Sequence, residues 1–261
     1  IVRALRESLW AQGFLEVEPP VLVDGPALEE NLEPIRAHDG FLHTSPEFAL
    51  KRVLAAGLPR IFAVTPCFRG LESGPQHGAE FTMLELYLNN ANYLDLIPVV
   101  ETLVSAAATS VGVATPAFER VTVSELFGGQ VPGDDDTFYR RWVEAIDPLL
   151  VRPTWVMDFP ARQAALAEVR GLVAERLELY LGGMELGNGF SELGDGDELR
   201  ARFARSAEIR AARGQSPHPT DEGVIAATSR LPRCAGIALG VDRLVMALTG
   251  ARDITGVRVP R

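Results

Sequence analysis

Residues 61–88 read IFAVTPCFRGLESGPQHGAEFTMLELYL and contain two apolar runs separated by a loop. Ile61–Phe68 and Glu80–Leu88 have the lengths and the branched and aromatic residues that are typical of β-strands. The loop over residues 70–79 holds three glycines and one proline, which favour turns. This stretch therefore predicts a long β-hairpin whose two strands pair in the antiparallel sense.

The second of these strands carries polar side chains among apolar ones. Because side chains alternate between the two faces of a strand, Phe81, Met83, Glu85 and Tyr87 share one face. If that face is buried, the carboxylate of Glu85 needs a partner, and a cation would supply it. If the face is exposed to solvent, Glu85 needs none. The residues leave both arrangements open.

A second hairpin is predicted at Gly182-Gly183, because two glycines between strand-like segments favour a two-residue turn. Counting outward from the turn pairs residue 181 with 184, 180 with 185 and 178 with 187. Glu178 and Glu185 then share a face as diagonal neighbours, about 7–8 Å apart. Two carboxylates at that distance can share a divalent cation, and ligation by oxygen favours Mg²⁺. Two solvent-exposed glutamates would produce the same pattern.

Two glycine-containing segments complete the polar motifs. Residues 187–192 read GNGFSE, whose spacing differs from the GxGxxG fingerprint of dinucleotide sites, and an ordinary turn also fits. Residues 236–244 read GIALGVDRL and predict a strand, a glycine turn and a helix. We expect Asp242 to cap this helix and Arg243 to lie beside its free N–H groups, which suits a phosphate. A cap pair without any ligand is the alternative.

The rest of the chain predicts helices around a sheet. Helices are expected over residues 1–12, 46–56, 95–111 and 197–213, with Ser45 as the cap of the second. Further strands are expected at Trp155–Phe159 and Leu177–Leu181. Hairpins recur and simple β-α-β units do not. The expected fold is therefore α+β, an antiparallel sheet flanked by helices, in a single domain over residues 1–261.

Composition excludes some functions. With 261 residues, 47% of them hydrophobic, the chain can bury a substantial core. No apolar run reaches the roughly 18 residues that span a bilayer, so no membrane partner is expected. A net charge of −10 argues against broad, nonspecific binding of nucleic acid and suits a basic protein partner. Cys67 and Cys234 have no metal-ligand spacing, and reduced thiols of a cytoplasmic protein are expected.

Taken in order, these segments resemble the catalytic domain of the class II lysyl-tRNA synthetases over essentially the whole chain. They are most similar to the elongation factor P–lysine ligases, paralogues of those synthetases that lack the anticodon-binding domain. The segments similar to class II motifs 1, 2 and 3 are Leu15–Pro20, Phe68–Phe81 and Gly236–Arg243. Those similar to the lysine subgroup are Thr44–Glu47 and Glu185–Leu193, and those similar to the ligase paralogues are Arg210–Gly214 and His218–Asp221.

The resemblance implies a role for each matching residue. Arg69 and Arg243 are the expected catalytic residues, with Arg69 on the α-phosphate of ATP and on the substrate carboxylate. The expected ATP and Mg²⁺ contacts are Arg69, His77, Phe81, Glu178 and Arg243 for ATP, and Glu178 and Glu185 for Mg²⁺. The expected contacts of the amino acid are Glu47 on its α-ammonium group, Glu85, Tyr87 and Glu192 on its side-chain ammonium group, and Ser45, Asn188 and Phe190 around them.

The implied activity is ATP-dependent activation of lysine or a lysine isomer as the adenylate, followed by ligation to a lysine side chain of elongation factor P. The alternatives are the catalytic domain of a lysyl-tRNA synthetase, with tRNA as acceptor, and a non-catalytic synthetase-like binding protein. The resemblance to motif 1 implies a homodimer. Three places depart from the family pattern: Leu71 replaces the usual motif 2 glutamate, Gly78-Ala79 replaces the usual Asn-Pro after the motif 2 histidine, and Gly187 matches the synthetases rather than the ligase paralogues.

Overall fold

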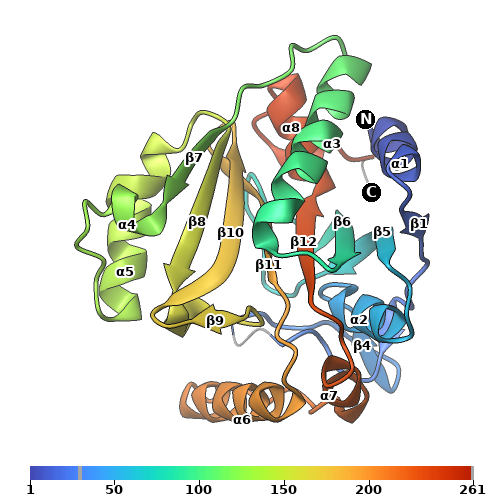
Figure 1. The fold of residues 1–261 in the computed structure, drawn as a ribbon, viewed down its shortest axis with the longest axis vertical. Coiled ribbons are helices and arrows are strands. Elements are labelled where there is room, and N and C mark those ends of the chain that lie inside the picture. Colours follow the sequence, from blue (N-terminus) through green and yellow to red (C-terminus); the bar gives the residue numbers. More distant parts are fainter. Residues whose placement is uncertain (29–30, 260–261) are drawn as a thin grey trace.

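Residues 1–28 and 31–259, described by this computed structural model, build a nine-stranded sheet with helices packed around it (Figure 1). The strand order is β1-β5-β6-β12-β11-β10-β8-β7, and β9 pairs beside β10. The inner pairs are antiparallel, whereas β1 with β5 and β7 with β8 are parallel. The predicted α+β fold is confirmed, with parallel pairs added at the two edges of the sheet.

The strands of the large sheet are β1 (Leu15–Glu16), β5 (Arg60–Phe68), β6 (Glu80–Asn89), β7 (Glu119–Thr122), β8 (Thr154–Pro160), β9 (Val169–Arg170), β10 (Val173–Leu181), β11 (Met184–Ser191) and β12 (Cys234–Gly240). A small sheet contains β2 (Leu22–Val23), β3 (Arg36–Ala37) and β4 (Gly40–Leu42). The α-helices are α1 (Val2–Ala11), α2 (Glu47–Ala55), α3 (Leu96–Ser110), α4 (Val123–Leu126), α5 (Asp135–Arg141), α6 (Gly196–Ala212), α7 (Glu222–Thr228) and α8 (Val241–Thr249).

One face of the sheet is apolar and is covered by α1, α3 and α8. Leu9 of α1, Leu103 of α3 and Leu244 of α8 belong to one buried cluster with side chains of the sheet. The sheet residues of that cluster include Phe62, Leu84, Leu86, Trp155, Leu177, Leu179, Ile237 and Leu239. Because alternate residues of a strand point to opposite faces, the polar residues between them project from the other face.

The opposite face is bordered by α2, α6 and α7, in the lower part of Figure 1. Leu50 and Leu54 of α2 pack on Ile61 of β5 and on the ring of Tyr87. Arg210 of α6 is 1% exposed and donates hydrogen bonds to the backbone oxygens of Leu32 and Ser216. Arg210, in the segment that resembles the ligase paralogues, therefore anchors α6 by hydrogen bonds to the backbone at Leu32 and Ser216.

A compact aromatic unit packs against β8 and β10. It consists of α4, α5 and a π-helix at Trp142–Ile146, shown at the left of Figure 1. The rings of Phe138 and Trp142 stack with centroids 5.4 Å apart. Trp142 also donates a hydrogen bond from Nε1 to the hydroxyl oxygen of Tyr180 on β10. This unit fixes one wall beside the polar face of the sheet.

The predicted first hairpin is confirmed, and the second is confirmed except for its register. Strands β5 and β6 pair from Arg60 with Leu88 to Phe68 with Glu80. Gly182 and Gly183 form the predicted turn with φ of 63° and 75°. A β-bulge between Leu179 and Tyr180 then shifts the pairing by one residue. The predicted pairing of 178 with 187 is wrong, and Glu178 pairs with Asn188.

Two predicted helix caps are also wrong. Helix α2 begins at Glu47 with Pro46 as its N-cap residue, although Ser45 Oγ accepts a hydrogen bond from the backbone N–H of Glu47. The N-cap residue of α8 is Gly240, and Asp242 Oδ2 instead accepts a hydrogen bond of 2.6 Å from the backbone N–H of Thr82 on β6. No helix within the two described ranges is long and apolar enough to cross a membrane.

Candidate active site

The floor of the polar face is β12, whose residues on that face, Gly236, Ala238 and Gly240, are small. Its pairing sets Gly236 opposite Tyr87 on one side and Phe190 on the other, and sets Ala238 opposite Glu85 and Asn188. A Cβ atom at Gly236 would lie 2.3 Å from the ring of Tyr87 and 2.8 Å from Glu192 Oε1. Only glycine fits at position 236, because a larger residue would clash with both neighbouring side chains.

Glu85 lies at one end of this floor and is 2% exposed, so the solvent-exposed arrangement is wrong. Ser45 Oγ donates a hydrogen bond of 2.7 Å to Oε2, and the Tyr87 hydroxyl donates one to Oε1. Burial and the nearby carboxylate of Glu47 raise the pKa of Glu85 to about 7, although the hydrogen bonds from Tyr87 and Ser45 oppose the shift. Two neutral hydroxyls support the carboxylate but do not balance its charge.

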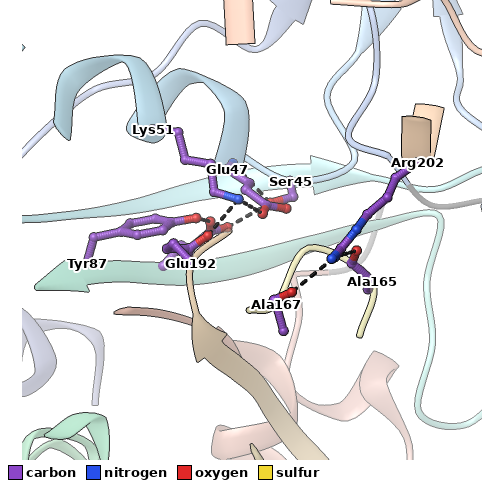
Figure 2. Close-up of polar contacts among 9 residues, drawn as sticks. Ser45, Glu47, Lys51, Tyr87, Ala165, Ala167, Glu192 and Arg202 are labelled. Atoms are coloured by element: carbon purple, nitrogen blue, oxygen red, sulfur yellow. Dashed lines mark hydrogen bonds and ion pairs between the residues drawn. The ribbon is translucent and has the colours of Figure 1, made fainter. Parts of the chain in front are cut away.

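Glu47 and Glu192 lie beside Glu85 and share a cation from the chain itself. Lys51 Nζ is 2.7 Å from Glu47 Oε1 and 2.7 Å from Glu192 Oε2 (Figure 2). The other oxygen of Glu192, Oε1, has no hydrogen-bond partner among the described residues. The structure thus brings together Ser45, Glu47, Glu85, Tyr87 and Glu192, which were expected around the amino acid, and adds Lys51, which the sequence reasoning missed.

A cavity of about 310 Å³ is lined by residues of the β10–β11 hairpin together with His77 and Arg243. Arg243 Nη2 lies 2.5 Å from His77 Nε2, and Nη1 donates a hydrogen bond of 2.7 Å to the backbone oxygen of Glu185. Burial lowers the pKa of His77, and the Arg243 guanidinium lowers it further, so the ring is neutral and accepts from Arg243. Both residues were predicted for the phosphates, and both line the cavity.

Glu178 and Glu185 also line this cavity, on the same face of the β10–β11 hairpin. Glu178 is 6% exposed, accepts a hydrogen bond of 2.5 Å from Arg176 Nη2 and accepts another of 3.0 Å from the Tyr180 hydroxyl. Burial raises the pKa of Glu178 to about 7; Arg176 opposes this shift and Glu185 adds to it. The bulge changes the pairing of the strands, but Glu178 and Glu185 still face the same cavity.

Arg69 and Phe81, both predicted for ATP, lie against each other. The guanidinium of Arg69 is 5.0 Å from the centroid of the Phe81 ring. Leu71, the departure in motif 2, has a φ of 63° and is 92% exposed. Glu72 Oε1 lies 3.7 Å from Arg69 Nη1 instead. The loop therefore turns residue 71 outward and presents the carboxylate of residue 72 to the site.

Residues 1–259 match the family of class II tRNA synthetases (D, K and N). The chain belongs to this family. It is 36% identical to a Pectobacterium atrosepticum protein named elongation factor P–(R)-β-lysine ligase, over 98% of this chain and 91% of that protein. It is 34% identical to a Proteus mirabilis protein of the same name, with the same coverage. An Aquifex aeolicus homolog of that ligase is 33% identical, over 97% of this chain and 94% of that protein.

Within this class II site, Arg176 is a second residue that the sequence reasoning missed. Its Nε donates a hydrogen bond of 2.9 Å to Asn188 Oδ1, while Nη2 contacts Glu178. It therefore connects a residue predicted for the amino acid to one predicted for the metal. Alternation could have indicated it, because Arg176, Glu178 and Tyr180 are successive polar residues on one face of β10.

Gln163, a third missed residue, lines the cavity from the short 3-10 helix Ala161–Gln163 that follows β8. It is 6% exposed, and its backbone oxygen accepts a hydrogen bond of 2.8 Å from Arg176 Nη1. Its Oε1 has no hydrogen-bond partner among the described residues. A lone glutamine between two strands gives no sequence signal, because only the folded chain shows that it is buried beside the site.

The segment 187–192 is strand rather than a glycine turn. Gly187 and Gly189 belong to β11 and point toward the apolar face, where added Cβ atoms would lie 2.4 Å from Leu239 and 2.7 Å from Ile237. Asn188 and Phe190 consequently point to the polar face. The glycines let β11 approach β12 closely, which brings Asn188 next to the floor.

The donor set fits Mg²⁺ only together with other ligands. Among the described residues no group of three or more histidine, cysteine or acidic side chains could hold a metal ion. Glu178 and Glu185 supply two carboxylates, and Mg²⁺ commonly takes one or two carboxylates plus water and substrate phosphates. Burial is the main cause of the raised pKa of Glu178, and a bound dication would favour its ionised form.

Proposed function

We propose that this protein activates lysine or a lysine isomer with ATP and ligates it to a lysine side chain of elongation factor P, within one catalytic domain. The observation that carries this proposal is the two-ended site. Buried carboxylates at Glu85 and Glu192 lie at one part of the polar face, and Arg243, at the start of the helix that follows β12, lines a cavity together with His77. The names of the curated relatives support the same activity and point to β-lysine.

The carboxylates suit the amino acid of the first reaction, and the cavity with Arg243 and His77 suits the ATP. Each ammonium group of a diamino acid needs a carboxylate, and among the described residues the hydrogen-bond donors to Glu85 are neutral hydroxyls, with no ion pair. Arg69 would hold the substrate carboxylate beside the α-phosphate, with Phe81 against adenine. The carboxylate oxygen then attacks the α-phosphorus, the bond to the β-phosphate breaks, and pyrophosphate leaves. No protein base is needed, because the attacking carboxylate is already ionised.

Catalysis in this arrangement rests on position and charge. Arg243 and His77 would hold the outer phosphates, and the neutral His77 ring keeps Arg243 oriented. Bound Mg²⁺ would neutralise negative charge on the phosphates and on the leaving pyrophosphate. Glu178 and Glu185 are the residues that would hold it. In the second step the amine of an acceptor attacks the adenylate carbonyl, an amide forms and AMP leaves.

The test is ATP–pyrophosphate exchange with lysine, (R)-β-lysine and ornithine, followed by transfer to elongation factor P or to tRNA. We expect exchange with lysine or its β-isomer and a stable amide on elongation factor P. Charging of tRNA without modification of the protein acceptor would identify a lysyl-tRNA synthetase instead. Calorimetric binding of ATP without exchange for any of the three amino acids would identify a binding protein.

We also propose a homodimer built through α1, β1 and β2, and a cytoplasmic location. Trp10 and Leu15 are each 52% exposed and Leu22 is 48% exposed, and β1 is an edge strand of the large sheet. An exposed apolar group beside an open strand edge is suited to a second copy of the chain. Sedimentation should give the dimer mass, and Trp10→Glu should shift it toward the monomer. The two buried, unpaired cysteines suit a reducing compartment.

A further inference from the structure

Lys51 has a place in the amino-acid pocket that the proposed activity does not use. It projects from α2 with 3% of its surface exposed, and it is the only lysine in the sequence. Its ammonium group touches Glu47 on its own helix and Glu192 at the end of β11. The ring of Phe190 lies 5.5 Å away. Figure 2 shows the ammonium group between the two carboxylates.

The charges around Lys51 do not balance. The carboxylates of Glu47, Glu85 and Glu192 face one ammonium group. Tyr87, Cys67 and Cys234 also lie nearby and are neutral, because burial raises the pKa of each. With all three carboxylates ionised, the pocket lacks two positive charges. Glu192 also keeps one oxygen, Oε1, without a hydrogen-bond partner among the described residues. The two ammonium groups of a diamino acid would supply these two positive charges.

We propose that Lys51 is a positioning residue that fixes Glu47 and Glu192 and cancels one of three buried carboxylate charges, so that the pocket matches two substrate ammonium groups. The proposal rests on the proposed function of this site. A buried ion pair adds little net stability compared with apolar packing, so its value here lies in orientation and charge. Without Lys51, three carboxylates would repel one another, and protonation would remove the groups that hold the substrate.

A direct test uses the fact that the chain has one lysine. Labelling with ¹⁵N-lysine gives a single side-chain ammonium resonance, from Lys51. We expect it to be visible at neutral pH because two ion pairs protect it from exchange with water, and to shift on addition of lysine without losing its charge. A resonance lost to rapid exchange, or unchanged by saturating lysine, would overturn the proposal. This measurement needs neither a variant nor turnover.

The second test compares Lys51→Met with Arg52→Met. Both variants lose one cation from α2, but Arg52 contacts Asp221, outside the pocket. We expect Lys51→Met to raise KM for lysine on the order of 100-fold, as truncation of a buried charge partner does, with a smaller effect on KM for ATP. The acidic limb of the pH profile for lysine should move to higher pH, because Lys51 lowers the pKa of Glu192 and of Glu85.

The outcomes separate the two proposals. If the unaltered protein supports exchange with lysine and Lys51→Met matches it in KM and pH profile, Lys51 has only a structural role and the inference fails. If the unaltered protein exchanges with no amino acid, the proposed function fails, and the ammonium resonance alone decides whether Lys51 is held as described. If Lys51→Met does not fold, Lys51→Arg keeps the charge and should retain part of the lysine dependence, whereas full wild-type behaviour in it would show that position is unimportant.

Discussion

Tyr87 and Glu85 project from the same face of β6, and the Tyr87 hydroxyl donates a hydrogen bond to the Glu85 carboxylate. Ser45 donates to the other carboxylate oxygen. Hydroxyl groups orient a carboxylate without neutralising it, so the geometry of Glu85 is fixed while its charge remains available. Under the proposed function, a substrate ammonium group would supply the positive charge that pairs with Glu85.

Glu85→Gln should therefore impair lysine activation far more than ATP binding. The amide keeps the shape of the carboxylate but removes the charge, and we expect kcat/KM for lysine to fall on the order of 100-fold. Glu85→Ala should be at least as severe, and Tyr87→Phe milder because it removes only a hydroxyl. Exchange kinetics measure the first effect and calorimetry with ATP the second. Equal losses in both would place Glu85 outside the amino-acid pocket.

Lysine binding should release a proton near neutral pH. Burial raises the pKa of Glu85 from 4.5 to about 7, and an ammonium ligand favours the ionised carboxylate. Binding should thus tighten as the pH rises through this value. Calorimetry in two buffers of different ionisation enthalpy detects the released proton. In Glu85→Gln the number of protons released should fall, and any remaining release is expected from Glu192, whose pKa burial raises to about 8; an unchanged number would show that Glu85 does not contribute.

The same pKa shift predicts how the unliganded protein responds to pH. Between pH 4.5 and about 7 the folded protein keeps a proton on Glu85 that the unfolded chain has lost. The stabilisation from this proton is complete below pH 4.5 and disappears as the pH rises through about 7, a change of about 3 kcal/mol for a shift of this size. Denaturant unfolding at several pH values should show this slope in the unaltered protein and a flatter one in Glu85→Gln.

The parts of the site that sequence predicts are those set by local patterns. Alternation along β6 places Glu85 and Tyr87 on one face, and the glycine pair locates the turn between β10 and β11. The bulge at Tyr180 is not predictable in this way, because it depends on how β10 fits β8 and β11 together. Lys51 lies 141 residues from Glu192 in the chain, so only the folded structure shows that they pair. The burial of Glu85 likewise depends on the packing of α2 against β6, which the sequence does not show.

Glu178→Gln and Glu185→Gln should each raise the Mg²⁺ concentration needed for half-maximal exchange, on the order of tenfold or more. Each variant removes one of the two carboxylates that face the cavity, and the remaining ligand and the phosphates hold the ion less firmly. Asp147→Asn is the matched control, because Asp147 lines the same cavity without being an expected ligand. A Mg²⁺ dependence that changes only in Asp147→Asn would show that the metal lies elsewhere.

Gly236→Ala should weaken lysine binding while the protein stays folded. A Cβ atom at this position would meet the Tyr87 ring at 2.3 Å and Glu192 Oε1 at 2.8 Å, so both side chains must move. We expect a rise in KM for lysine and little change in ATP binding. Gly133→Ala, where a Cβ atom would meet nothing within 4 Å, should leave both unchanged. Unaltered lysine kinetics in Gly236→Ala would show that the substrate does not use this floor.

The single lysine leads to a prediction about self-modification, which rests on the proposed ligation. An aminoacyl adenylate acylates unprotonated amines, but Lys51 is buried, and although burial lowers its pKa the carboxylates of Glu192 and Glu47 outweigh that effect and raise it. Its amine is therefore protonated and cannot attack. Prolonged incubation with ATP, Mg²⁺ and lysine should leave every side-chain amine of the protein unmodified by peptide mass mapping. An added lysyl group on Lys51 would contradict the buried, ion-paired state.

Introducing an exposed lysine at the cavity should remove this protection. Val143 is 65% exposed and lines the cavity, so Val143→Lys should gain one lysyl group. Leu172 is 87% exposed but does not line the cavity, and Leu172→Lys is the matched control. Modification confined to Val143→Lys would show that the adenylate reacts where it is made, because an adenylate released into solution reaches both positions. Equal modification of the two variants would instead show that the site releases its intermediate before transfer.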